Sequence, residues 1–135
     1  EIYAHRKSAE LPPSIVAMIA TDEAGAEVAH EAALQISAMA PQWLSREDVP
    51  ADVVESERRV ATEKSLAEGK PEKIVPKIVE GRLQAFYKEV CLLEQAYVKD
   101  PSGTIADLFR SVNGTALAFA RVEVGKGPQA EEAAE

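Results

Sequence analysis

The side chains that most often carry enzyme chemistry are few and scattered in this sequence. The two histidines, His5 and His30, lie far apart along the chain, and no nucleophile–base pair can be recognised around either. The one cysteine, Cys91, is flanked by Val90 and Leu92. A low thiol pKa needs nearby positive charge, which such an apolar setting does not offer. We therefore expect no catalytic residues.

Sequence motifs for phosphates and metals are also missing. The chain has no Gly-rich phosphate loop, no H-E-x-x-H and no C-x-x-C. Residues 125–127 read G-K-G, but a polar tail follows them instead of the helix that a phosphate loop needs. We expect neither a metal nor a cofactor, and a function in binding another protein.

Composition limits the partners. The 135 residues are 46% hydrophobic and 28% charged, which suits a folded domain. The net charge of −8 repels phosphate backbones, so nucleic acid is not expected as a direct partner. No apolar run approaches the ~20 residues of a membrane span, so no membrane is expected either. A lone cysteine cannot form an internal disulfide, which fits a reducing compartment.

Both ends of the chain predict strands. Residues 2–6 are compatible with a strand, and the apolar run 15–19 has the length of a buried one. Residues 117–124 predict a third strand, since Val122 and Val124 alternate with charged neighbours. Residues 23–40 show helical spacing and lead into Pro41, which ends a helix.

Two long helices are predicted in the middle of the chain. Ser45 begins a capping box, and helical composition follows from residue 51 to 68. Gly69 closes this helix and Pro71 opens a second one, over residues 72–93, with a strong apolar stripe. Pro76 and Gly81 interrupt the second helix and are expected to bend it. The pair forms an αα-hairpin of roughly 30 Å.

The predicted fold class is α+β: a small antiparallel sheet of about three strands with packed helices and an inserted long αα-hairpin, like a coiled coil. Residues 100–103 predict a turn, and Thr104 caps a short helix after it. Residues 1–50 and 94–127 then form the body and residues 51–93 the hairpin. Residues 128–135, with three acidic side chains and no basic one, predict a disordered tail.

Four segments resemble the elongation factor Ts family, in the family's order. Residues 77–100 resemble its block K-I-V-E-G-R-x-x-x-F-x-K-x-x-x-L-L-E-Q-x-x-V-K-D. Residues 47–58 resemble E-D-V-P-x-x-x-V-x-x-E-R, residues 69–72 match G-K-P-E, and residues 119–125 resemble F-x-R-x-E-V-G. The resemblance covers nearly all of residues 1–127.

This resemblance implies a guanine-nucleotide exchange factor of the bacterial cytoplasm, or of an organelle, whose partner is elongation factor Tu. It also implies a half-molecule, the second of two related core subdomains with the hairpin inserted. The first subdomain's T-D-F-V motif, which reaches toward the partner's nucleotide, has no equivalent here. Residues 21–24 resemble it only superficially, because the aromatic residue is missing. We therefore expect weak binding to elongation factor Tu and poor nucleotide exchange.

The resemblance also implies three partner-binding residues, Ile15, Val16 and Gln35. Ile15 and Val16 stand where the family has the start of its I-G-V-L-V strand, and Gln35 takes the place of a histidine on the following helix. A buried amide without partners costs on the order of 1–3 kcal/mol. We expect the Gln35 amide to lie at a surface edge where the partner satisfies it, so that Gln35→Ala weakens binding and leaves the melting temperature nearly unchanged.

Two other function classes stay open. The first is a structural interaction module that self-associates through the hairpin, as the excess of large apolar residues on its second helix would allow. The second is a small hydrolase, for which Cys91 is the only thiol nucleophile and no base is found.

Overall fold

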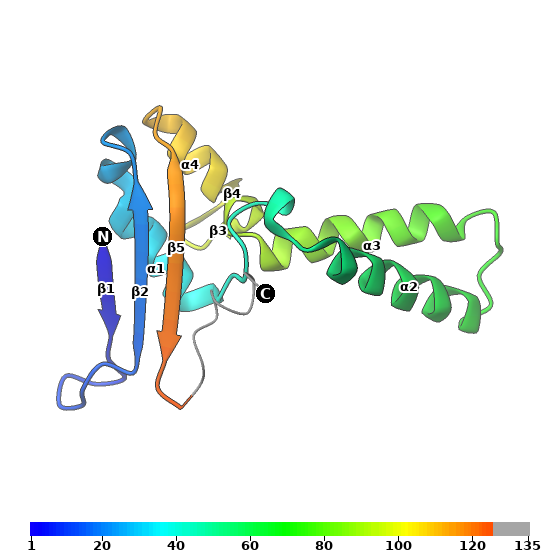
Figure 1. Cartoon of the computed structure of the whole chain (residues 1–135), viewed down its shortest axis with the longest axis horizontal. Helices are drawn as coiled ribbons and strands as arrows, with labels where there is room; N and C mark the ends of the chain where they lie inside the picture. The colour runs from blue at the N-terminus through cyan, green and yellow to red at the C-terminus, as the bar shows by residue number, and fades with distance from the viewer. Residues whose placement is uncertain (126–135) are drawn as a thin grey trace.

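A three-stranded antiparallel sheet forms the body of the protein. The structure is a computed structural model that describes residues 1–125. The sheet has the order β1–β2–β5, from strands β1 (Ile2–His5), β2 (Ile15–Thr21) and β5 (Ala116–Glu123). The strands from the two ends of the chain thus flank β2 (Figure 1). The α+β prediction is confirmed.

Helices cover one face of this sheet. Helix α1 (Ala29–Met39) packs on β1 and β2 from behind in the view of Figure 1. The helix predicted over residues 23–40 is wrong in its first turn, which is the 3₁₀ helix η1 (Ala24–Val28). The core between the layers includes Ala17, Ile19 and Ile36. The small side chains of α1 allow the close approach of helix and sheet.

A short 3₁₀ helix, a pair of short strands and a helix follow the αα-hairpin in sequence. The 3₁₀ helix η3 (Leu92–Glu94) leads to the short strands β3 (Ala96–Tyr97) and β4 (Asp100–Thr104), which pair with each other. The turn predicted over residues 100–103 is therefore wrong, because these residues belong to β4. Helix α4 (Ile105–Ser111) begins as predicted at Thr104, whose side chain accepts a hydrogen bond from the Asp107 amide.

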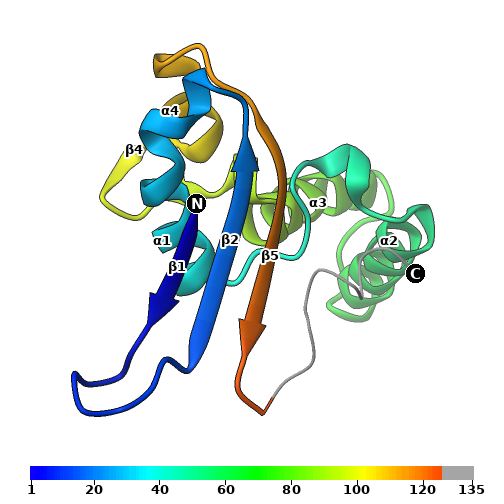
Figure 2. The ribbon, with the colours of Figure 1, turned by 60° about the vertical axis from the view of Figure 1, so that its left-hand side comes forward.

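The αα-hairpin is present and projects from the body (Figures 1 and 2). Helices α2 (Ala51–Ala67) and α3 (Val75–Val90) are joined through Gly69, whose φ of 79° is the left-handed conformation that ends a helix. Lys70 N donates to Ser65 O at 3.1 Å, which closes the last turn of α2. The prediction that Pro71 opens α3 is wrong. Residues 71–74 form a turn, and the helix begins at Val75.

Small residues of α2 let the two helices meet closely. Ala61 packs with Val79 and Leu83 of α3, and Ser65, one turn later on α2, is buried as well. At the base of the hairpin, the 3₁₀ helix η2 (Arg46–Asp48) follows the predicted capping box at Ser45. The Arg46 guanidinium binds the carboxylate of Glu94 and stacks over the ring of Tyr87.

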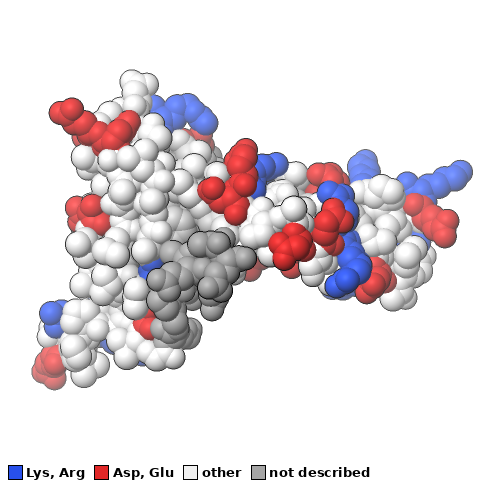
Figure 3. Space-filling model, in the orientation of Figure 1, with Lys and Arg blue, Asp and Glu red and all other residues white. Residues whose placement is uncertain are grey.

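The other face of the sheet is open and apolar. Side chains alternate between the two faces of a strand. Ala17 and Ile19 of β2 point toward α1, so their neighbours Val16, Met18 and Ala20, and the residues paired with these on β1 and β5, point away from α1. All of these are aliphatic: Ile2, Ala4, Val16, Met18, Ala20, Ala118, Ala120 and Val122. Ile2 remains 67% exposed and Val122 43% exposed. In Figure 3, charged side chains are sparse over the sheet and frequent along the hairpin.

Candidate protein-binding site

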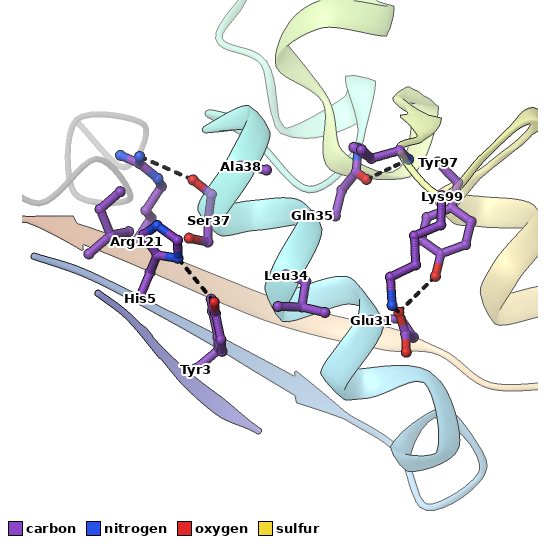
Figure 4. Close-up of a pocket in the computed structure, with 12 residues that line it drawn as sticks. Tyr3, His5, Glu31, Leu34, Gln35, Ser37, Ala38, Tyr97, Lys99 and Arg121 are labelled. Carbon is purple, nitrogen blue, oxygen red and sulfur yellow. Dashed lines mark hydrogen bonds and ion pairs between the residues drawn. The ribbon is translucent and has the colours of Figure 1, made fainter. Parts of the chain in front are cut away.

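A cavity of about 500 Å³ opens beside the sheet, between helix α1 and the β3–β4 hairpin (Figure 4). We call it the α1 pocket. It receives side chains from β1, β2, α1, β3 and β5 and from the connection between β3 and β4. Its lining residues are Tyr3, His5, Ile15, Glu31, Leu34, Gln35, Ser37, Ala38, Tyr97, Val98, Lys99 and Arg121.

The walls of the α1 pocket are largely apolar. Leu34 and Ala38 come from successive turns of α1, and Ile15 comes from the start of β2. Val98, in the connection between β3 and β4, forms the opposite wall and is 53% exposed. When an apolar group of another molecule displaces water from exposed aliphatic carbon, the binding free energy becomes more favourable.

One side of the pocket carries a charged cluster. The Glu31 carboxylate accepts a hydrogen bond from the Tyr97 hydroxyl at 2.8 Å and forms an ion pair with Lys99. These hydrogen bonds, first from Lys99 and then from Tyr97, lower the pKa of Glu31. Burial and the bond to Glu31 raise the pKa of Tyr97 to about 12, so its hydroxyl stays protonated and donating at neutral pH. The cluster joins α1 to the β3–β4 hairpin.

The other side of the pocket is formed by the sheet. Arg121 is only 6% exposed, and its guanidinium donates to the carbonyl of Ser37 at 3.3 Å and pairs with Glu123. The ring of His5 shares a hydrogen bond with the Tyr3 hydroxyl at 3.0 Å. Two strands, a helix and a hairpin therefore supply polar groups around an apolar centre, which is the composition of a protein-binding surface.

Gln35 lies at the centre of these contacts, but its amide is satisfied within the chain. It is 2% exposed. Its Nε2 donates to Gln95 Oε1 at 3.2 Å and to Ala96 O at 3.1 Å, and its Oε1 accepts from Val98 N at 3.0 Å. The expectation that the amide lies at a surface edge for a partner to satisfy is therefore wrong. The partners that satisfy it lie just before, within and just after β3, a strand that the sequence did not predict.

Gln35→Ala is accordingly expected to lower the melting temperature by several degrees. The truncation leaves the buried Gln95 amide and the partly buried backbone groups of Ala96 and Val98 without their partner, at a cost on the order of 1–3 kcal/mol. Gln42 is exposed and makes none of these bonds, so Gln42→Ala provides a control that stays within about 0.5 kcal/mol of wild type. Thermal denaturation followed by circular dichroism measures both. Equal melting temperatures for the two variants would contradict the internal bonding of Gln35.

The three residues singled out in the sequence do not share one surface. Ile15 and Gln35 both line the α1 pocket. Val16 follows Ile15 directly and so points to the opposite, open face of the sheet. Sequence analysis missed Glu31, Tyr97 and Lys99 as pocket residues. Lys99 belongs to the V-K-D end of the motif block, which was a signal for a role, whereas Tyr97 falls on an unspecified position just before it.

In the part of the chain that the structure describes, the other candidates for a chemical site are weak. Burial, and next the charge of Glu94, raise the pKa of the Cys91 thiol to about 12, which makes it a poor nucleophile. Within residues 1–125, no three His, Cys, Asp or Glu side chains are grouped closely enough to hold a metal ion. None of the helices in that range combines the length and the apolar composition needed to cross a membrane.

Comparison with known proteins gives a consistent result. A family model described as elongation factor TS matches residues 1–126. The chain is 82% identical over 131 residues to an elongation factor Ts of Bifidobacterium animalis. It is 49% identical over 126 residues to that of Mycobacterium ulcerans and 48% identical over 128 residues to that of Corynebacterium diphtheriae.

The matches cover most of this chain but less than half of each relative. They include 97% of the chain for the Bifidobacterium protein and 93% for the other two. In each case the matched region is 46% of the relative. The chain thus spans about half the length of the curated relatives that it matches.

Proposed function

The chain belongs to the elongation factor Ts family, and from this premise we propose that it binds elongation factor Tu and contributes to the release of GDP during translation elongation. The observation that carries this proposal is the α1 pocket. Two residues that the family resemblance marks for partner contact, Ile15 and Gln35, line one open cavity with apolar walls and a charged edge.

The α1 pocket has the features of a site for a protruding apolar side chain of the partner. Such anchors carry most of the binding free energy when they fill a pocket and lose contact with water. Ile15, Leu34 and Val98 would surround the anchor, and the charged pair of Glu31 and Lys99 at the edge would orient it. In this proposal Ile15 contacts the partner and Gln35 holds the Val98 wall in place.

Binding of this kind can promote exchange without a catalytic residue. An exchange protein can bind the nucleotide-free partner more tightly than the GDP-bound partner. The affinity of the partner for GDP then falls by the ratio of these two binding constants. Such a difference requires a broad, shape-matched surface and no proton transfer. The poor nucleophilicity of Cys91 agrees with a binding protein rather than an enzyme.

We also propose that residues 1–50 and 94–127 form the second of two related core subdomains, with residues 51–93 as an inserted hairpin. The open apolar face of the sheet, which includes Val16, supports this division. A face made only of aliphatic side chains resembles one layer of a sandwich, and the relatives have as much sequence again to supply the second layer. The tail at residues 128–135 lies outside the described residues.

Stopped-flow release of a fluorescent GDP analogue from elongation factor Tu tests the proposal. The chain is expected to accelerate release, but less than the full-length Bifidobacterium animalis factor does, because it has no T-D-F-V motif. Equal acceleration by the two proteins would show that this motif is dispensable. No acceleration and no binding would refute the proposed function.

A second function is favoured by the surface of the hairpin. Val60 is 53% exposed and lines a shallow groove of about 290 Å³ between α2 and α3. A second copy of the chain could bury this groove and form a dimer through the hairpins. Light scattering on the chain and on a Val60→Asp variant would separate the two proposals. A dimer that this substitution dissociates would support self-association.

A further inference from the structure

A second buried amide, Gln95, connects the α1 pocket to the hairpin. It is 2% exposed. Its Oε1 accepts a hydrogen bond from Gln35 Nε2 at 3.2 Å, and its Nε2 donates to Glu89 O at 2.8 Å. Glu89 belongs to the last turn of α3, where carbonyl groups lack partners within the helix. One side chain therefore bonds both the end of a hairpin helix and the residue that holds the pocket wall.

The orientation of both amides is determined by their backbone partners. Val98 N can only donate, so the atom of Gln35 that faces it must be the oxygen. Glu89 O can only accept, so the atom of Gln95 that faces it must be the nitrogen. The remaining atoms, Gln35 Nε2 and Gln95 Oε1, then face each other as donor and acceptor. The two amides fit together in one arrangement, and flipping either would place like groups together.

The pocket wall depends on this arrangement. Gln35 holds the wall by bonding Ala96 O and Val98 N, the backbone groups on either side of Tyr97. The carboxylate of Glu31 binds the Tyr97 side chain, but within residues 1–125 no hydrogen bond other than that to Gln35 fixes the Val98 amide. Loss of the acceptor on Gln95 would leave Gln35 Nε2 with one partner and its rotamer less constrained. The wall would then move although Gln95 itself does not line the cavity.

We propose that Gln95 is a positioning residue of the α1 pocket: through Gln35 it sets the Val98 wall, and it ties that wall to the end of α3. This inference rests on the proposed function, since it takes the pocket as the site that receives elongation factor Tu. It implies that a shift of the hairpin changes the width of the pocket, so that contacts made far out on the hairpin affect binding at the body.

Three variants of the full chain test this role. Gln95→Met keeps the size of the side chain and removes both hydrogen bonds. Gln95→Glu retains an oxygen that can accept from Gln35, but it replaces the donor to Glu89 O with a second oxygen and buries a carboxyl group. Ile36→Val removes a buried methyl group next to Gln35 on α1 and touches no polar bond, so it controls for a general loss of stability. Amide exchange of Val98 by nuclear magnetic resonance and affinity for nucleotide-free elongation factor Tu are measured for each.

In Gln95→Met the Val98 amide is expected to exchange about tenfold faster, and the dissociation constant to rise about tenfold, because the wall opens locally. For Ile36→Val, the ratio of the Val98 exchange rate to the rates of other core amides should stay within about twofold of the wild-type ratio. Gln95→Glu should be less stable, because it loses the bond to Glu89 O, but its Val98 exchange relative to other core amides and its affinity should stay closer to wild type than those of Gln95→Met, because the acceptor for Gln35 is kept. Unchanged Val98 exchange in Gln95→Met would overturn the inference. If that variant does not fold, a loss of Val98 protection in Gln95→Glu greater than that of the other core amides would overturn it. A wild-type chain that does not bind would instead refute the proposed function.

Discussion

Replacing Gly114 by alanine is expected to lower the free energy of unfolding by about 3 kcal/mol and the melting temperature by about 10 °C. A Cβ at Gly114 would lie 2.5 Å from Gly25 Cα and 2.6 Å from Gly25 N. Both are backbone atoms, so no side chain can move to make room. The contact joins the loop before β5 to η1, where the Asp22 carboxylate also binds the amides of Gly25 and Thr115.

Gly81→Ala is the matched control, with an effect of opposite sign. Gly81 lies in the middle of α3, and a Cβ there would meet nothing within 4 Å. Alanine in an exposed helix interior is favoured over glycine by roughly 0.5–1 kcal/mol, so this variant should be more stable. Urea denaturation measures both. A Gly114→Ala variant as stable as Gly81→Ala would contradict the close approach of the two glycine backbones.

Val98→Asp is expected to weaken binding to elongation factor Tu by a factor of about 30 or more. The substitution places a carboxylate in the wall of the α1 pocket, and docking of an apolar group would remove water from that charge without providing a partner. The free chain should keep its melting temperature, since Val98 is 53% exposed. Titration calorimetry with nucleotide-free elongation factor Tu measures the loss.

Val60→Asp controls for the general effect of a new surface charge. Val60 is also a valine that is 53% exposed, but it lies on the hairpin, away from the pocket. It should bind elongation factor Tu within about threefold of wild type. If the two variants lose affinity equally, the pocket is not the main contact. If only Val60→Asp loses affinity, the hairpin groove is the binding site.

Local signals in the sequence predicted the parts of the fold that depend on short-range contacts. Gly69 is followed by a polar turn and Pro71, and the chain reverses there because glycine adopts the left-handed conformation easily. Thr104 and Asp107 form a capping box that fixes the start of α4. The alternation around Val122 placed β5 correctly, because one face of that strand is buried and the other open.

The remaining features depend on pairings between distant residues. The sequence of residues 100–103 does not reveal that β4 pairs with β3, because its Pro and Gly are typical of a turn. The start of α3 shifted to Val75 because Pro71 opens a turn there rather than the helix. Gln35 was expected at a surface edge, because the partners that satisfy its buried amide lie some 60 residues later and left no local signal.

The family resemblance supplied three candidate contact residues, but the fold does not place all three on one surface. Neighbours on one strand, Ile15 and Val16 point to opposite faces, one toward the α1 pocket and the other toward the open face of the sheet. A sequence motif records which residues occur together. It does not state which of them share a surface, and that information comes from the register of β2 with its neighbours.

The most direct test of the account is a titration of the wild-type chain into nucleotide-free elongation factor Tu. We expect saturable one-to-one binding with a dissociation constant on the order of 1–100 µM, because the chain spans only 46% of its relatives and offers a small interface. The Val98→Asp variant should show almost no heat under the same conditions. Absence of saturable binding by the wild-type chain at about 1 mM would contradict the assignment of the α1 pocket as a partner site.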